Sequence, residues 1–414
     1  MGVTGRSWRR VGRDRRVGAV LLSLGLLVSA CTASPTAANT NGPRGGATTT
    51  STAGNGSTTA TVTTTTTAPA AVAANVVAGR SAVPWSEVGE GWLLATWSST
   101  VRFVTGQGTG PATLFLVDPA GGRYDLGSAP SDRLLDWSGS GTEALFLMPS
   151  TSGTVGPSQL ATEDLRTGAE AVFSIPSSST AYEVKFSKPE GTALLVPGSP
   201  ARRYSVSGTL QVTYPTVLPD GGTASNAGGT VAETSRGNEL VLQAAGGFDV
   251  VANTGSARGF LPPPPGQRTC ALDGWWSGSD FLETCANQLL VQADSGGPPR
   301  VVASSTTGGE YIDAWTVGGQ VIAEAGACGT TWLVKVGKDG APHRVTVPGA
   351  GSVAGVGAAG SQLAVLVTPS CDEPTTRQGD LLEWYAPETG ALRTVLGGAD
   401  GGGTVDAAVV EDMR

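Results

Sequence analysis

Cysteine and histidine are the side chains with the widest chemistry, and this 414-residue sequence holds five cysteines and one histidine. Cys285, Cys328 and Cys371 follow one another at intervals of 43 residues, and Cys270 lies 15 residues before Cys285. The absence of a C-x-x-C pair argues against a zinc site. Four cysteines, an even number, follow Cys31, and in a chain sent out of the cytoplasm such a set favours disulfides. The expected pairs are Cys270–Cys285 and Cys328–Cys371, with Cys285–Cys328 as the competing arrangement.

The common catalytic motifs are missing from the sequence. It contains no G-x-S-x-G, H-E-x-x-H or P-loop pattern. A Ser-His-Asp triad would need His343 to reach a cleft, but His343 lies beside the predicted turn Asp339-Gly340. The glycine-rich segment 106–110 lacks the strand-turn-helix setting of a phosphate site. We therefore expect no catalytic residues.

Acidic and aromatic side chains are the remaining candidates for a binding site. Asp136, Asp273 and Asp313 each lie one to three residues before an aromatic residue in a short apolar segment. Trp275 and Trp276 are adjacent, so strand alternation would bury one ring and expose the other. An exposed indole could stack on a sugar or a peptide. Packing between neighbouring elements is the alternative role for the other tryptophans.

A hairpin made of two short apolar strands around a glycine-bearing turn recurs along the chain and must position these side chains. Glycine in such turns supplies a positive φ without steric cost. Successive turns are 39 to 50 residues apart, which is the period of a four-stranded propeller blade. The hairpins are predicted at 114–126, 160–175, 204–214, 240–251, 289–302, 332–347 and 381–396.

A second element, an aromatic-Ser-x-x-x-Gly pattern between two strands, alternates with these hairpins. The same strand-turn-strand element occurs at 136–146, and the full pattern is best preserved at 185–195. Degenerate copies lie around 225–226, 276–277, 315–316 and 356–357. The pattern resembles the blade signature of TolB-like and related WD-repeat-like propellers. The resemblance covers the whole folded region and implies an all-β fold.

We predict a β-propeller of seven four-stranded blades over residues 81–414, with six or eight blades as alternatives and a sandwich or two stacked β domains as rivals. Residues 83–94 would complete the seventh blade. The C-terminal segment 404–409 echoes 311–316 and would instead pair with the first blade and close the ring. The two segments compete for the same innermost position.

In such a ring, Asp136, Glu183, Asp273, Asp313 and Asp406 would lie at or near innermost strands. A ring of carboxylates there could hold Ca²⁺ or a basic peptide. Their offsets from the neighbouring aromatic residue differ, however, and strand alternation would then send them to different faces. Solvated carboxylates at the mouth of the channel are the alternative interpretation. No other cofactor is expected.

The N-terminus carries a targeting signal. Six arginines and one aspartate precede an apolar stretch at 17–30, which is too short to span a bilayer stably. The string Leu27-Val28-Ser29-Ala30-Cys31 resembles the lipobox of bacterial lipoproteins, which implies cleavage before Cys31 and lipid attachment to its thiol. Ordinary secretory cleavage and an uncleaved anchor are the alternatives. Arginine pairs at 9–10 and 15–16 leave twin-arginine export open.

Three regions follow: a signal peptide at 1–30, a low-complexity Thr/Ala/Gly linker at 31–80, and the folded domain. The linker lacks apolar periodicity and cannot bury enough surface to fold, so it forms a tether. Removing residues 1–30 takes away six arginines and one aspartate, so the net charge of −8 becomes −13. A chain so acidic has no electrostatic basis for binding nucleic acid.

These features predict a monomeric lipoprotein on the outer face of the cytoplasmic membrane. We expect it to present its propeller as a binding or scaffold module to an envelope protein. A module that binds cell-wall glycan or a small ligand is the first alternative. A metal-dependent propeller hydrolase or lactonase is the second, and it would need convergent Asp, Asn and Glu ligands that the sequence does not assemble.

Overall fold

The computed structural model describes most of the chain from residue 77 to residue 410. The described residues are 77–99, 111–138, 142–149, 158–176, 183–188, 191–198, 200–215, 231–233, 238–244, 247–263, 270–277, 280–285, 287–293, 295–305, 309–327, 329–369, 379–397 and 403–410. Cys31, Cys328 and Cys371 lie outside them. No helix within these ranges is long and apolar enough to cross a membrane.

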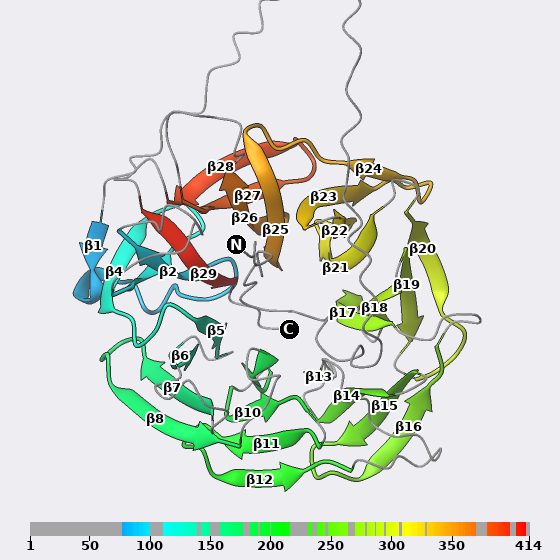
Figure 1. Cartoon of the computed structure of the whole chain (residues 1–414), viewed down its shortest axis with the longest axis horizontal. Coiled ribbons are helices and arrows are strands. Elements are labelled where there is room, and N and C mark those ends of the chain that lie inside the picture. Colours follow the sequence, from blue (N-terminus) through cyan, green and yellow to red (C-terminus); the bar gives the residue numbers. More distant parts are fainter. Residues whose placement is uncertain are drawn as a thin grey trace, which may run out of the picture. The chain divides into compact units, whose positions relative to one another are not determined.

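Seven sheets, antiparallel apart from one parallel strand pair in blade 1, stand around a common axis and form a seven-bladed β-propeller (Figure 1). Blade 1 combines β2 (Leu93–Ser98), β3 (Thr113–Val117) and β4 (Arg123–Ser128) with β29 (Thr404–Val410) and β1 (Val77–Gly79). Blade 2 holds β5 (Leu134–Trp137), β6 (Glu143–Leu147), β7 (Ser158–Asp164) and β8 (Glu170–Ile175). The predicted number of blades is confirmed.

The other blades repeat this meander, and in each the first strand is innermost. Blade 3 holds β9 (Lys185–Phe186), β10 (Ala193–Val196), β11 (Arg202–Ser205) and β12 (Leu210–Thr213). Blade 4 holds β13 (Val231–Glu233), β14 (Glu239–Ala244), β15 (Gly247–Ala252) and β16 (Ala257–Leu261). Blade 5 holds β17 (Ala271–Ser277), β18 (Asp280–Cys285), β19 (Gln288–Ala293) and β20 (Arg300–Ser304). Blade 6 holds β21 (Glu310–Val317), β22 (Gln320–Ala327), β23 (Thr330–Val336) and β24 (Pro342–Arg344), and blade 7 holds β25 (Ala350–Ala359), β26 (Gln362–Pro369), β27 (Leu381–Ala386) and β28 (Ala391–Leu396).

The C-terminal strand closes the ring. β29 pairs antiparallel with β2, from Leu93 opposite Val410 to Ser98 opposite Thr404. Residues 83–92 form turns and extended chain instead of an innermost strand, so their predicted place as a seventh unit is wrong. The C-terminal segment occupies the innermost position of blade 1, where its apolar residues contact both blade 1 and blade 7.

Six of the seven predicted outer hairpins are found as the third and fourth strands of their blades. In blade 4 the predicted hairpin at 240–251 joins the second and third strands, β14 and β15. The outer hairpin of that blade is β15–β16, and its turn contains Gly255 with a φ of 89°. The predicted hairpin is one strand too early in the chain, because glycine lies in the turns both before and after β15 and either turn fits the repeat. The predicted copy at 225–226 lies outside the described residues.

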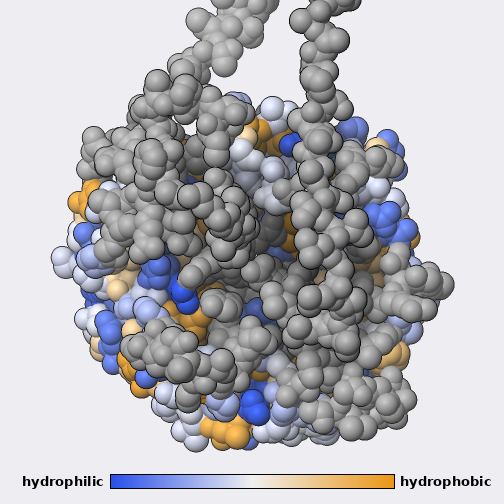
Figure 2. Space-filling model, in the orientation of Figure 1, coloured by the Kyte–Doolittle hydropathy of each residue, from blue (hydrophilic) through white to orange (hydrophobic). Residues whose placement is uncertain are grey.

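The apolar core is divided into seven clusters, one at each junction between neighbouring blades. Successive side chains of a strand point to opposite faces, so each blade contributes to two clusters. Leu282 of β18 packs toward blade 6, for example, whereas Phe281 packs toward blade 4. The exposed large hydrophobic side chains within the described ranges are Val77, Val172, Leu210 and Val301. All four lie on outermost strands, and Figure 2 shows hydrophobic residues scattered among hydrophilic ones around the edge of the ring. Isolated exposed apolar residues of this kind are common on soluble surfaces.

Arg80 fastens the start of the folded region to the junction between blades 1 and 2. β1 pairs in parallel with β4, and Arg80 follows it directly in a short 3-10 turn. The Arg80 guanidinium donates to the Leu126 carbonyl of blade 1 and, at 2.8 Å, to Glu163 Oε1 of blade 2. The Glu163 side chain is only 2% exposed, and burial raises its pKa while the hydrogen bond and charge of Arg80 lower it. The ion pair therefore compensates a buried carboxylate.

Replacing Arg80 should destabilise the ring. We expect Arg80→Met to lower the free energy of unfolding by about 3 kcal/mol, because it leaves the Glu163 carboxylate buried without its cation. Urea unfolding followed by tryptophan fluorescence measures the loss.

The matched control is Arg393→Met. The Arg393 guanidinium joins blades 7 and 1 through the exposed carbonyls of Pro119 and Ala120, so its loss should cost under about 1 kcal/mol. Adding Glu163→Gln to Arg80→Met should restore part of the stability. Equal effects of the two arginine substitutions would contradict the assigned role of Arg80.

Candidate functional site

Four of the five acidic residues predicted at or near innermost strands lie at or beside β-bulges. In β17, Leu272 is opposite Glu283 and Gly274 is opposite Leu282, so Asp273 is the extra residue. Comparable register shifts occur next to Asp136 in β5, Asp313 in β21 and Asp406 in β29. A bulge adds one residue to one strand and re-aims the side chains around it. Strict alternation therefore does not hold in these strands, and it cannot be used to assign the acids to faces.

Asp136 forms a tie between two blades. Its Oδ2 accepts a hydrogen bond of 2.7 Å from the Phe186 backbone N–H of β9, and the Lys188 ammonium lies 3.9 Å from Oδ1. Lys188 also donates to the Trp137 carbonyl at 2.9 Å. The carboxylate of blade 2 thus binds the innermost strand of blade 3.

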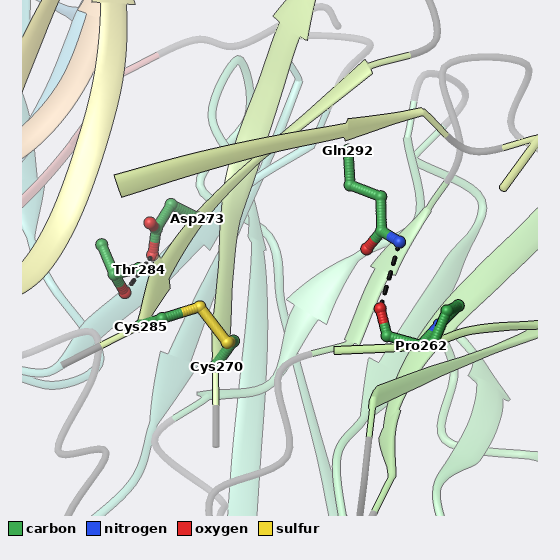
Figure 3. The surroundings of a disulfide bond; sticks show 6 residues. All are labelled: Pro262, Cys270, Asp273, Thr284, Cys285 and Gln292. Carbon is green, nitrogen blue, oxygen red and sulfur yellow. Dashed lines mark hydrogen bonds between the residues drawn. A yellow bond between two sulfur atoms is a disulfide. The ribbon is translucent and has the colours of Figure 1, made fainter. Parts of the chain in front are cut away.

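Asp273 and Asp313 are nearly buried, with 7% and 8% of their surface exposed. Asp273 Oδ1 accepts from the Thr284 hydroxyl at 3.3 Å, as Figure 3 shows. Asp313 Oδ1 accepts from the Ala314 backbone N–H at 2.9 Å. Both acids therefore support the bulges in which they lie. The solvated carboxylates proposed as the alternative do not describe these two residues.

Asp406 and Asp380 lie together where β29 meets blade 7. The Ser98 hydroxyl donates to Asp406, and the Val405 N–H donates to the Asp380 carbonyl at 3.0 Å. Burial raises the pKa of the Asp380 side chain to about 6, a hydrogen bond from Thr368 lowers it, and the negative charge of Asp406 raises it. Two carboxyl groups therefore lie at the junction of blades 7 and 1, where the ring closes.

Two further buried acids escaped the sequence analysis and also tie blades together. Glu233 of β13 accepts from the Lys188 backbone N–H of blade 3 and lies 3.3 Å from the Arg203 guanidinium. Glu324 of β22 accepts from the Gly355 N–H of blade 7 at 3.0 Å. In the sequence, both could have been found as single acidic residues within apolar strand segments. Glu183, by contrast, is half-buried just before β9.

The predicted carboxylates do not assemble into one metal site. Within the described ranges, the only cluster of three or more His, Cys, Asp or Glu side chains close enough to share an ion is Cys270, Glu283 and Cys285. Asp136, Asp273 and Asp313 instead keep separate hydrogen-bond partners. A Ca²⁺ site built from them is not supported by this geometry.

The Cys270–Cys285 disulfide is present and joins the start of β17 to the end of β18 (Figure 3). This confirms the expected staple of one hairpin and excludes the competing pair Cys285–Cys328. Glu283 lies on the same strand as Cys285, is fully buried, and within the described part of the chain neither of its oxygens has a hydrogen-bond partner. Burial alone raises the pKa of Glu283 to about 7.

Trp275 and Trp276 belong to β17, with the Trp275 backbone opposite Phe281. Their side chains lie outside the described residues. His343 is exposed on β24, the outermost strand of blade 6, which agrees with its expected place in an outer hairpin.

Stability should depend on the ionisation of Asp380. Its folded pKa is about 6 and its ordinary value is 3.8, so the folded state holds this proton more tightly than the unfolded chain does. The contribution of Asp380 to stability is therefore fully present below about pH 4 and is lost as the pH rises through about 6. The free energy of unfolding of the wild type should therefore fall between pH 4 and pH 7. We expect Asp380→Asn to remove about 2 kcal/mol of that fall, after allowance for the partial exposure of the side chain.

Urea unfolding of the wild type and Asp380→Asn at pH 4 and pH 7 measures the difference. Glu388→Gln, at an exposed turn of blade 7, is the control and should be about as stable as the wild type at pH 7. Parallel pH profiles for the wild type and Asp380→Asn would contradict the assignment.

Comparison with known proteins identifies similarity of fold alone. No family model and no curated protein matches the chain. Among solved structures, the β-propeller domain of the Trilobed protease from Pyrococcus furiosus is 10% identical, with a TM-score of 0.49 over 76% of this chain and 94% of that one. A putative TolB from Agrobacterium tumefaciens is 12% identical, with a TM-score of 0.40 over 73% and 99% of the two chains. A putative 6-phosphogluconolactonase from Bacteroides uniformis is 13% identical, with a TM-score of 0.46 over 78% and 98%. Such low similarity carries no inference about function.

Proposed function

We propose that this chain is a cell-envelope lipoprotein that presents a seven-bladed propeller as a binding module for another envelope protein. Cys31 carries the lipid, and the ring supplies the binding surface. The tether is the part of the predicted linker 31–80 that precedes β1, since residues 77–80 belong to the fold. The proposed location is the outer face of the cytoplasmic membrane. The lipobox-like string before Cys31 supports the anchor, and the Thr-rich composition supports the tether.

The join between tether and ring is the observation that carries this proposal. Val77–Gly79 form β1, which pairs with β4 at the outer edge of blade 1. Arg80 then bonds to both blades 1 and 2. The first described residues of the chain therefore lie at the rim of the ring, which is where we propose that the tether joins it. A module attached in this way keeps its faces available for a partner.

The acids that join neighbouring blades favour a supporting role over a catalytic one. Asp136, Glu233 and Glu324 each accept a backbone N–H of a neighbouring blade. Carboxylates engaged in this way hold neighbouring blades in a fixed relation. A rigid ring of this kind suits recognition, because little conformational entropy is lost when a partner binds.

The β17–β18 hairpin is the proposed contact element. The Cys270–Cys285 disulfide fixes one end of the hairpin, and Trp275 and Trp276 belong to the opposite end of β17. Tryptophan is enriched among the residues that dominate binding energies at interfaces. The net charge of −13 expected after cleavage favours a neutral or basic partner surface.

The lipid anchor is tested by Cys31→Ala in the native host. The variant should move from the membrane fraction to the soluble or secreted fraction, because it lacks the thiol that takes the lipid. Immunoblots of the fractions provide the measurement, and Cys371→Ala serves as a control that should stay with the membrane. Full retention of the cleaved Cys31→Ala variant in the membrane fraction would refute lipidation.

The binding role is tested by cross-linking the full-length protein in intact cells and identifying the captured proteins by mass spectrometry. One reproducible envelope protein should appear, and its yield should fall at least tenfold with Trp275→Ala and Trp276→Ala combined. Leu210→Thr, on the outermost strand of blade 3, is the control and should leave capture unchanged.

Other outcomes would redirect the proposal. Capture of wall fragments alone would replace the protein partner with a glycan. A stoichiometric divalent ion in the purified protein, lost together with Asp136→Asn, Asp273→Asn or Asp313→Asn, would favour a metal-dependent hydrolase instead.

A further inference from the structure

The second strand of each blade follows a rule that blade 5 breaks. Side chains of this strand that face the preceding blade are apolar in the six other blades and belong to the clusters between blades. They are Leu93 and Ala95 of β2, Ala144 and Phe146 of β6, Leu194 and Val196 of β10, Leu240 and Leu242 of β14, Val321, Ala323 and Ala325 of β22, and Leu363, Val365 and Val367 of β26.

In β18 the corresponding side chains are those of Phe281, Glu283 and Cys285. Phe281 and Cys285 pack toward blade 4, and strand alternation places Glu283 between them on the same face. Glu283 is 0% exposed, and within the described ranges neither carboxyl oxygen finds a hydrogen-bond donor. A buried carboxyl without a partner is costly, and a leucine or an alanine would follow the rule of the other blades.

The two cysteine sulfurs are the nearest chemistry to this carboxyl. Cys270 and Cys285 face each other across β17 and β18, and the next opposed pair on that face is Leu272 and Glu283. One Glu283 oxygen and both Sγ atoms lie within 4.8 Å of one another. All three residues are buried, so the group is enclosed by the apolar junction of blades 4 and 5.

We propose that Cys270, Cys285 and Glu283 form a redox-dependent Zn²⁺ site, closed while the disulfide is intact and opened by its reduction. A thiol reductant supplies two electrons and two protons, the S–S bond breaks, and two thiols form. Zn²⁺ then binds the two thiolates and the carboxylate, and the thiol protons are released to solvent together with any proton held by the carboxyl. A water molecule or another small donor completes the four-coordinate geometry that zinc prefers.

The chemistry of the donor set selects zinc. Two thiolates and one carboxylate are ordinary zinc ligands, whereas Ca²⁺ and Mg²⁺ prefer oxygen ligands alone. Zinc–sulfur and zinc–oxygen bonds of about 2.0–2.3 Å fit a cluster of this size after a small opening of the two sulfurs. The β17–β18 backbone ladder runs from Ala271 to Ser277 and holds the ligands near one another without the S–S bond.

The test uses the full-length chain with Cys31, Cys328 and Cys371 changed to serine, so that Cys270 and Cys285 are its only thiols. The protein is reduced with a phosphine, separated from the reductant, titrated with ZnCl₂ and assayed for bound zinc by mass spectrometry of the eluted metal. Titration with Co²⁺ in parallel reports thiolate ligation through its visible absorption. We expect one zinc per reduced chain and none per oxidised chain.

Variants separate the three ligands. Glu283→Gln should weaken zinc binding to the reduced chain at least tenfold, and Cys270→Ser with Cys285→Ser should abolish it. Glu324→Gln is the matched control, because it is also a buried glutamate on a second strand but has its own partner, the Gly355 N–H. It should bind zinc as tightly as the parent chain.

Thermal unfolding keeps the proposal falsifiable if reduction loosens the fold. Zinc should raise the Tm of the reduced parent chain and leave that of reduced Glu283→Gln unchanged. Equal zinc affinity of the parent chain and Glu283→Gln would overturn the site, as would stoichiometric zinc in the oxidised chain or no zinc in the reduced one.

Discussion

The pairing of β29 with β2 is the constraint on which the rest of the structure depends. Each blade buries both faces against its neighbours, so seven blades have seven apolar junctions only if the last blade meets the first. β29 supplies that meeting from the far end of the chain, and the Ser98–Asp406 hydrogen bond joins residues 308 positions apart. Val405, Ala408 and Val410 of β29 share one cluster with residues of blade 7. The pairing thus places residues 93–98 and 404–410 in one sheet, with β29 as the innermost strand of blade 1.

Directional hydrogen bonds then fix the angle between neighbouring blades. Apolar packing favours contact but is not directional, so many angles between two sheets would bury similar areas. Carboxylates that accept a backbone N–H from the next blade remove this freedom, as the half-buried Asp136 does for Phe186 and the buried Glu324 for Gly355. These bonds are charge-assisted, which offsets part of the cost of removing the carboxylates from water. We interpret the acids of the first and second strands chiefly as residues that hold neighbouring blades at a fixed angle.

The spacing of turn glycines was sufficient to predict the blade number and most outer hairpins, because each turn fixes two strands at once. It failed in blade 4, where glycine lies at both ends of β15 and the repeat can be read in two registers. The bulges beside Asp136, Asp273 and Asp313 had no sequence signal, since an extra residue looks like any other until its partner strand is known. For the same reason sequence could identify candidate acids but not their partners. The Arg80–Glu163 pair joins residues 83 positions apart through a contact that only the assembled ring creates.

Glu283 and Glu324 show why burial alone does not define a role. Both are glutamates on second strands and at most 3% exposed. Glu324 faces the following blade, where a backbone N–H satisfies it, so its presence is explained by the architecture. Glu283 faces the preceding blade, where the six other blades place apolar side chains, and its neighbours are the two sulfurs of a disulfide. Packing alone gives no reason for a carboxyl there. A chemical state of the cysteines other than the disulfide does give one, and the ladder that pairs β17 with β18 would keep the three side chains together in that state.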